Sequence, residues 1–203
     1  MQKFESTLLD VRVEIVTTTF VASGIPEGVH DLERFLEMLN NVTSHHVELG
    51  SPAIRPLYRA SEQLHLDVPL LIRREEIVFA TFEGPQFVRG AERPARIDAP
   101  ILLLAPPFQI QGTLALPAGA VPTLAMRPTM NGFFAVTAAR VFDADGAPLG
   151  EGEQIIVNGA AVQMAAPTEQ HIQLTPAATA PPTRTLAIVD EAAQALSEDA
   201  RAA

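Results

Sequence analysis

Two segments of this 203-residue chain are alike enough to indicate an internal repeat. Residues 69–80 read PLLIRREEIVFA, and residues 154–165 read QIIVNGAAVQMA. At an offset of 85, four apolar positions of the two segments coincide, and Phe79 matches Met164 in kind. A repeat of this length constrains the fold more than any other feature, because each copy has to form the same supersecondary unit.

Two further matches lie upstream of this pair and follow the same order along the chain. Phe20 and Gly24 match Phe108 and Gly112 at an offset of 88, and residues 46–49 match residues 133–136 at an offset of 87. Three matches in one order, separated by small insertions or deletions, predict a tandem duplication.

The repeat predicts a mainly β protein built from two small tandem domains, each a barrel or rolled sheet of about five strands. The expected boundaries are residues 1–83 for the first domain, 84–95 for a linker and 96–166 for the second domain. A unit of about 75 residues buries only about 60 to 65% of its unfolded surface, so it is marginal alone. We therefore expect the two copies to pack together or to pair with another chain.

Local patterns place strands and one clear helix within the copies. Val11, Val13 and Ile15 alternate with charged residues, which indicates a half-buried strand. Asp31 is a good N-cap for a helix over residues 31–40, whose apolar residues recur with helical spacing. Glycines inside strands mark bulges or close backbone approaches, and we expect this of Gly24 and Gly112 in equivalent positions.

Each copy is expected to close with a hairpin. The first hairpin would turn at residues 73–76, and the second at Asn158-Gly159, a strong signal for a short turn. In the second copy, Pro122 and Pro128 leave room for one helical turn at most.

The chain resembles a family of small bacterial, mostly β domains that has no assigned activity. The family pattern runs V-x-I-x-T, then a glycine, a Leu-Asn pair, an aromatic strand and a closing I-x-V-N. The residues that carry it are Val13, Ile15, Thr17, Gly24, Leu39 and Asn40 in the first copy, and Gly112, residues 133–141 and Ile155, Val157 and Asn158 in the second. Because these are apolar and turn residues, the resemblance implies a fold and brings no catalytic or binding residues with it.

Composition excludes several classes of function. The chain has no cysteine, so it forms no disulfide and no thiolate metal site. Its net charge of −10 opposes binding to the phosphate backbone of nucleic acids. The N-terminal residues lack the apolar run of a signal peptide, and no segment has the length of a membrane span. We expect a cytoplasmic protein that binds neither nucleic acid nor membrane.

No catalytic, cofactor-binding or metal-binding site emerges from the sequence. His45, His46 and Glu48 form the densest group of potential metal ligands, but on a strand only His46 and Glu48 share a face. Zinc sites need three or four ligands, so we predict no metal here. Asp143 and Asp145 resemble the start of a calcium loop, yet the closing glutamate is missing and a plain turn is the better interpretation. The usual hydrolase motifs are absent.

The C-terminal segment, residues 167–203, is predicted to hold a docking element. Residues 171–185 are rich in Pro, Ala and Thr and resemble a flexible linker. A short helix over residues 186–200 would follow, with Leu186, Val189 and Leu196 on one side as candidate partner-docking residues. A helix this short needs a surface to dock on.

These observations favour a non-enzymatic scaffold or assembly module that acts through protein–protein contacts or self-association. The alternative is a sensor or regulator that binds a small ligand in a pocket between the two repeats, because domain interfaces often form pockets. Enzymatic activity ranks third, and no cofactor is expected.

Overall fold

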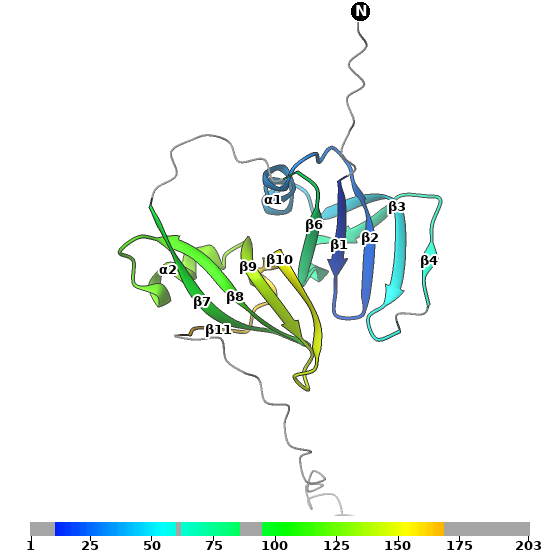
Figure 1. Cartoon of the computed structure of the whole chain (residues 1–203). Helices are drawn as coiled ribbons and strands as arrows, with labels where there is room; N and C mark the ends of the chain where they lie inside the picture. Colours follow the sequence, from blue (N-terminus) through cyan, green and yellow to red (C-terminus); the bar gives the residue numbers. More distant parts are fainter. Residues whose placement is uncertain (1–10, 60–61, 86–94, 169–203) are drawn as a thin grey trace, which may run out of the picture.

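A computed structural model describes residues 11–59, 62–85 and 95–168, which form one antiparallel sheet of eleven strands with two α-helices (Figure 1). The elements are β1 (Arg12–Val16), β2 (Phe20–Pro26), α1 (Leu32–Asn40), β3 (His46–Pro56), β4 (Leu64–His65), β5 (Leu70–Arg73), the 3₁₀ helix η1 (Arg74–Glu76), β6 (Phe79–Glu83), β7 (Arg96–Ala105), β8 (Phe108–Pro117), α2 (Pro122–Thr129), β9 (Phe133–Phe142), β10 (Pro148–Asn158), the 3₁₀ helix η2 (Gly159–Ala161) and β11 (Met164–Pro167). The predicted mainly β class is confirmed.

The strands follow the order β11-β7-β8-β9-β10-β6-β1-β2-β3-β4, and β5 pairs with β3 beside β4. The sheet is therefore open, and neither half closes into a barrel, which was one of the two forms predicted beside a rolled sheet. Closure of each half would require β6 to pair with β5 and β10 to pair with β11. Instead β6 and β10 pair with each other and join the halves into one sheet.

The secondary-structure elements follow the same order in the two halves of the sheet. In the first half (residues 11–85), β6-β1-β2-β3-β5 are neighbours, α1 lies between β2 and β3, and η1 lies between β5 and β6. In the second half (residues 95–168), β11-β7-β8-β9-β10 are neighbours, α2 lies between β8 and β9, and η2 lies between β10 and β11. Figure 1 shows the halves side by side, with the β6–β10 pairing between them.

The predicted closing hairpins are wrong. Strands β5 and β6 do not pair with each other: β5 pairs with β3, whereas β6 pairs with β1. The 3₁₀ helix η1 between them redirects the chain from one side of the first half to the other. The Asn158-Gly159 pair does not turn a hairpin either, because the Asn158 side chain accepts a hydrogen bond from the Ala160 backbone N–H and caps η2.

The predicted helix of the first half is confirmed as α1. The Asp31 carboxylate accepts a hydrogen bond of 2.7 Å from the backbone N–H of Arg34, and Phe35 and Leu39 are buried beneath the helix. The second helix, α2, has eight residues and is longer than the single turn expected. Pro122 occupies its first turn, where no N–H is needed, and Pro128 falls in its last turn.

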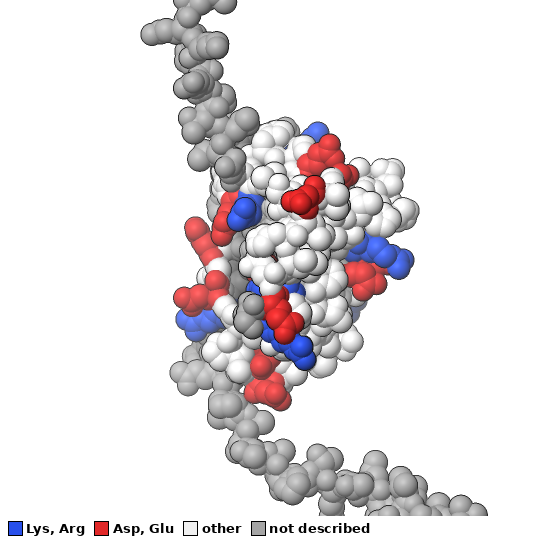
Figure 2. Space-filling model, turned by 90° about the vertical axis from the view of Figure 1, so that its right-hand side faces the viewer, with Lys and Arg blue, Asp and Glu red and all other residues white. Residues whose placement is uncertain are grey.

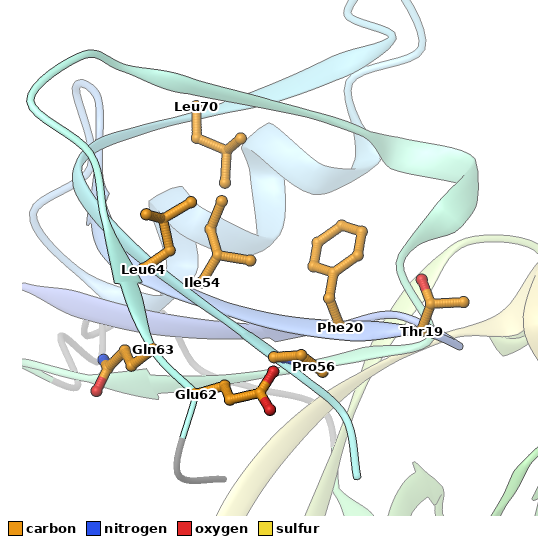
Figure 3. A pocket seen from close by; sticks show the side chains of 8 residues that line it. All are labelled: Thr19, Phe20, Ile54, Pro56, Glu62, Gln63, Leu64 and Leu70. Atoms are coloured by element: carbon orange, nitrogen blue, oxygen red, sulfur yellow. The ribbon is translucent and has the colours of Figure 1, made fainter. Parts of the chain in front are cut away.

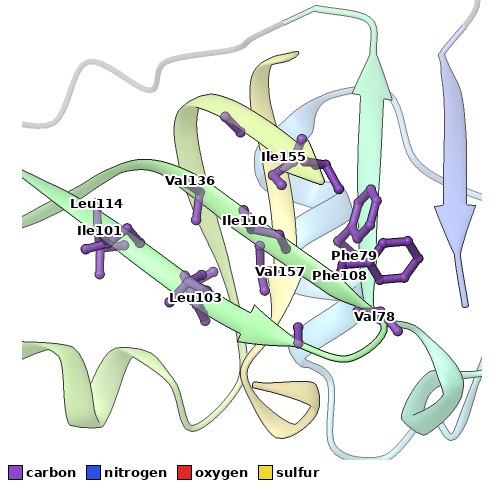
Figure 4. Packing of buried hydrophobic residues seen from close by; sticks show 14 of the residues in the cluster. Val78, Phe79, Ile101, Leu103, Phe108, Ile110, Leu114, Val136, Ile155 and Val157 are labelled. Carbon is purple, nitrogen blue, oxygen red and sulfur yellow. The ribbon is translucent and has the colours of Figure 1, made fainter. Parts of the chain in front are cut away.

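Two hydrophobic clusters fill the structure, one centred on each half, and both contain residues of the other half. The cluster of the second half includes Phe79 of β6, whose ring meets Phe108 edge-on with centroids 5.2 Å apart (Figure 4). The cluster of the first half includes Phe133 and Ile156 of the second half. The halves thus share their cores across the β6–β10 joint.

Gly24 and Gly112 both lie at irregularities in strand pairing, as predicted for glycines inside strands. The β2–β3 register shifts between Ser23 and Ile25, and the β8–β9 register shifts between Gln111 and Thr113. At each glycine, a Cβ atom would lie 2.9 Å from a backbone carbonyl oxygen of the neighbouring strand.

Strand β3 runs unbroken over His46–Pro56, although it contains Pro52 and Pro56. The middle of the predicted linker and the predicted docking helix with Leu186, Val189 and Leu196 lie outside the described residues. Among the described residues, neither helix has the length and apolar character needed to cross a membrane.

Candidate functional site

The two open ends of the sheet are the candidate contact surfaces of this structure. At one end, β11 pairs only with β7, and at the other end β5 pairs only with β3, within the described part of the chain. The outer side of each strand therefore presents backbone groups available to another strand. Unprotected edges of this kind are the usual sites of strand addition.

Each open edge carries a large exposed apolar side chain. Leu71 of β5 is 60% exposed, and Met164 of β11 is 64% exposed. The residues that occupy the corresponding positions at the β6–β10 joint are buried: Ile156 is 1% exposed and Phe79 is 7% exposed. The same kind of residue is thus covered where the sheet is continuous and uncovered where the sheet ends.

The joint between the halves is held by Asn40, the last residue of α1. Its Nδ2 donates to the Phe133 carbonyl oxygen at 2.9 Å, and its Oδ1 accepts from the Phe133 N–H at 2.8 Å. The same Nδ2 lies 3.1 Å from the Leu36 carbonyl oxygen within the helix. One amide side chain therefore satisfies both backbone groups of the first residue of β9.

Asn158, at the end of β10, holds the joint from the other half. Its side chain, only 4% exposed, donates from Nδ2 to the Ile77 carbonyl oxygen at 2.8 Å. Its backbone N–H donates to the Val78 carbonyl oxygen at 3.0 Å. The two asparagines of the Leu-Asn and I-x-V-N motifs are thus contacts between the halves and not parts of a reactive site.

A cavity of about 200 Å³ lies between the halves, where the alternative prediction places a ligand pocket. Its polar lining includes Asn40, Asn158 and Arg74. The Arg74 guanidinium donates to the carbonyl oxygens of Leu39 and Asn41, so all three side chains are engaged in protein contacts. These three side chains stabilise the joint, and His45, Glu75 and Asn131 complete the polar lining of the cavity.

A larger hollow of about 610 Å³ lies beside the β4 and β5 edge (Figure 3). Phe20, Ile54, Leu64 and Leu70 line it, and its polar contribution comes mainly from Thr19, Glu62 and Gln63. Because its walls are chiefly apolar and it adjoins an open strand, the hollow extends the apolar character of this edge.

His45, His46 and Glu48, the densest group of potential metal ligands in the sequence, lie at the start of β3. His46 and Glu48 lie on β3, and His45 precedes it. No three His, Cys, Asp or Glu side chains come together in the described residues as a metal site. Asp143 and Asp145 form a turn in which the Asp143 carboxylate accepts from two backbone N–H groups.

The functional candidates Leu71 and Met164 were missed by sequence reasoning. The signal that could have found them is the offset of 85, which equates Leu71 with Ile156 and Phe79 with Met164. That alignment shows matching residues, but exposure depends on which strands become neighbours.

Comparison of the chain with protein-family models, curated proteins and solved structures gives no match. Figure 2, seen from the β4 side of Figure 1, shows acidic and basic groups scattered over the surface with uncharged areas between them.

Replacement of Asn40 by Ala should destabilise the protein by about 2 kcal/mol, because it leaves the Phe133 N–H and carbonyl in a partly buried place without their partner. The adjacent residue provides a control: among the described residues the Asn41 side chain bonds only with Thr43, in an exposed turn, so Asn41→Ala should cost at most about 0.5 kcal/mol. Urea denaturation followed by circular dichroism measures both. Equal losses would contradict the role of Asn40 at the joint.

Proposed function

We propose that this protein is a tandem duplication that works as a non-enzymatic scaffold or assembly module, through the open edges of its sheet. The observation that carries the proposal is the exposure of Leu71 and Met164 on strands that have a free side. Partners would add strands to these edges, with main-chain hydrogen bonds giving affinity and the apolar side chains giving selectivity.

The duplication is supported by detailed agreement between the halves. A Cβ on Gly24 would meet Leu49, Gly50 and Pro52, and a Cβ on Gly112 would meet Val136, Thr137 and Ala139. These three pairs of neighbours all stand at the offset of 87 found for residues 46–49 and 133–136. The common order of strands and helices adds to this support. A shared ancestor for both halves accounts for such matched contacts more simply than chance.

The backbone hydrogen bonds around the 3₁₀ helices agree in the same way. The backbone N–H of Arg74 donates to the carbonyl oxygen of His45 at 2.9 Å. In the second half, the N–H of Gly159 donates to the carbonyl oxygen of Gly132 at 2.9 Å. Likewise, the backbone N–H of Val78 donates to the carbonyl oxygen of Val16, and the N–H of Gln163 donates to the carbonyl oxygen of Leu104. The chain therefore follows the same path from β5 through η1 to β6 as from β10 through η2 to β11. This supports equating β5 with β10 and β6 with β11.

The scaffold proposal is tested by placing a lysine on each edge in the full-length chain. Leu71→Lys and Met164→Lys introduce charge at exposed edge positions, and charge discourages strand addition. Leu149→Lys is the matched control, because Leu149 is 47% exposed and lies on β10, away from both free edges. Tagged variants are used to recover bound chains, which are then identified by mass spectrometry.

We expect the wild type and Leu149→Lys to retain the same bound chains, and each edge variant to lose a subset of them. Circular dichroism confirms that all variants are folded. If the four proteins retain identical chains in equal amounts, the edges do not mediate contacts and the proposed function is wrong.

A further inference from the structure

We infer that the free edges of β5 and β11 pair with each other between copies of this chain, head to tail, in the register of the β6–β10 joint. The inference rests on the proposed function, because it names a second copy as the partner of the sheet edges. The chain already contains one such joint, between β6 and β10, and it carries at its two free edges the two strands that a second joint would need.

The internal joint defines which strands would meet. Strand β10 pairs with β9 on one side and β6 on the other. In the first half, β5 has the position of β10, because it pairs with β3 and precedes a 3₁₀ helix. In the second half, β11 has the position of β6, because it follows a 3₁₀ helix and pairs with the first strand of its half. Strands β5 and β11 therefore correspond to the two strands of the internal joint, and each still has one unpaired side.

The offset of 85 converts the internal register into an intermolecular one. Within the chain, Ile156 faces Ala80, and the neighbouring pairs continue in antiparallel order. Subtracting the offset from Ile156 gives Leu71, and adding it to Ala80 gives Ala165. The predicted pairs are Leu70 with Ala166, Leu71 with Ala165 and Ile72 with Met164, each pair joining two copies.

This register would bury both exposed edge residues. Leu71 takes the place of Ile156, which is packed into the hydrophobic cluster of the opposite half. Met164 takes the place of Phe79, which is likewise packed into the cluster of the opposite half. Each side chain would enter the neighbouring copy, so one contact buries two apolar residues that are 60% and 64% exposed in the single chain.

Prolines limit the contact to the same length as the internal joint. Three residue pairs join β6 to β10. In the intermolecular register, the position beyond Leu70 and Ala166 brings Pro69 opposite Pro167. Because proline has no N–H to donate, pairing ends there. The short edges with terminal prolines also disfavour longer, unspecific pairing.

The partner is a second copy because the two edges differ and complement each other. Each chain offers one β5 edge and one β11 edge, at opposite ends of its sheet. A contact between unlike surfaces is heterologous, so it continues from copy to copy until a ring closes or a filament grows. The product expected is an assembly larger than a dimer.

The decisive experiment mixes two full-length variants that each lack one edge. Multi-angle light scattering after size exclusion should give the 21.8-kDa chain as a higher oligomer for the wild type and for Leu149→Lys. Leu71→Lys alone and Met164→Lys alone should be monomers, because each has lost one side of the only contact. Their mixture should form a 1:1 heterodimer through the intact β11 edge of the first and the intact β5 edge of the second.

Other outcomes separate this inference from the proposed function. A Met164→Lys protein that dimerises alone would show β5 pairing with β5, and a Leu71→Lys protein that dimerises alone would show β11 pairing with β11. Either result overturns head-to-tail pairing while the edges remain contact surfaces. A wild-type chain that is monomeric at every concentration overturns the inference; if the edge variants still lose heterologous partners, the scaffold proposal survives.

Cysteine cross-linking tests the register directly, since the chain has no cysteine of its own. Facing residues of antiparallel strands have Cβ atoms about 5 Å apart, within reach of a short bifunctional thiol reagent. The double variant Leu71→Cys/Ala165→Cys should give a ladder of linked chains, whereas each single variant should give none alone and linked dimers when mixed with the other. The control Leu71→Cys/Leu149→Cys should remain unlinked. A ladder from the control, or none from the facing pair, contradicts the register.

Discussion

Replacing Gly159 by Ala should destabilise the protein by about 3 kcal/mol or more, because the new methyl group would meet backbone atoms that cannot move aside cheaply. A Cβ at Gly159 would lie 2.5 Å from the carbonyl carbon of Met130, closer still to its oxygen, and 2.8 Å from the Gly132 oxygen. The Gly159 N–H donates to that Gly132 oxygen at 2.9 Å, so the chain after α2 is held against η2. Differential scanning calorimetry of the full-length protein measures the effect.

Gly150 supplies the control for this substitution. It lies on β10, where a Cβ would meet nothing within 4 Å. Gly150→Ala should therefore change the unfolding free energy by no more than about 0.5 kcal/mol. A Gly159→Ala protein as stable as the Gly150→Ala protein would show that the chain between α2 and β9 does not pack against η2 as described.

Gly112→Val should cost about 3 kcal/mol, and Gly24→Val should cost about 2 kcal/mol or more. At Gly112 a Cβ would lie 2.5 Å from Val136 Cγ1 and 2.9 Å from the Thr137 oxygen. At Gly24 a Cβ would lie 2.9 Å from the Gly50 oxygen and 3.0 Å from Leu49 Cβ. Urea denaturation measures both losses.

The two substitutions also compare the halves of the molecule. If the halves derive from one ancestral unit, each glycine allows the second strand of its half to approach the third strand closely. Both variants should then lose stability. Gly150→Val, in open space, serves as the control and should remain near wild-type stability. A large loss at one glycine with none at the other would contradict equivalent roles.

The proposed assembly gives the proposed duplication a physical consequence. A half of this size leaves apolar surface uncovered, and the β6–β10 joint covers part of it by sharing both hydrophobic clusters. The same joint cannot be completed at β5 and β11 within one chain, because these strands lie at opposite ends of the open sheet. Association between copies would complete it and bury Leu71 and Met164.

Much of the local structure follows from the sequence. Asp31 caps α1 because its carboxylate reaches a free amide of the first turn, and the spacing of Phe35 and Leu39 places both in the core. Alternating apolar residues indicate β1 and β8, and Gly24 and Gly112 mark the bulges. These features depend on contacts between residues close in sequence, or on a missing side chain.

Strand partners, and with them the candidate site, were decided by the tertiary structure. A period of two specifies which side chains share a face, but it does not specify which strand lies alongside. The sequence predicted a hairpin in which β5 would pair with β6. In the structure η1 separates these strands, and β6 pairs with β10. Ile156 and Leu71 follow the same pattern, and only the presence of β6 beside β10 buries the first while the second stays exposed at the edge of the sheet.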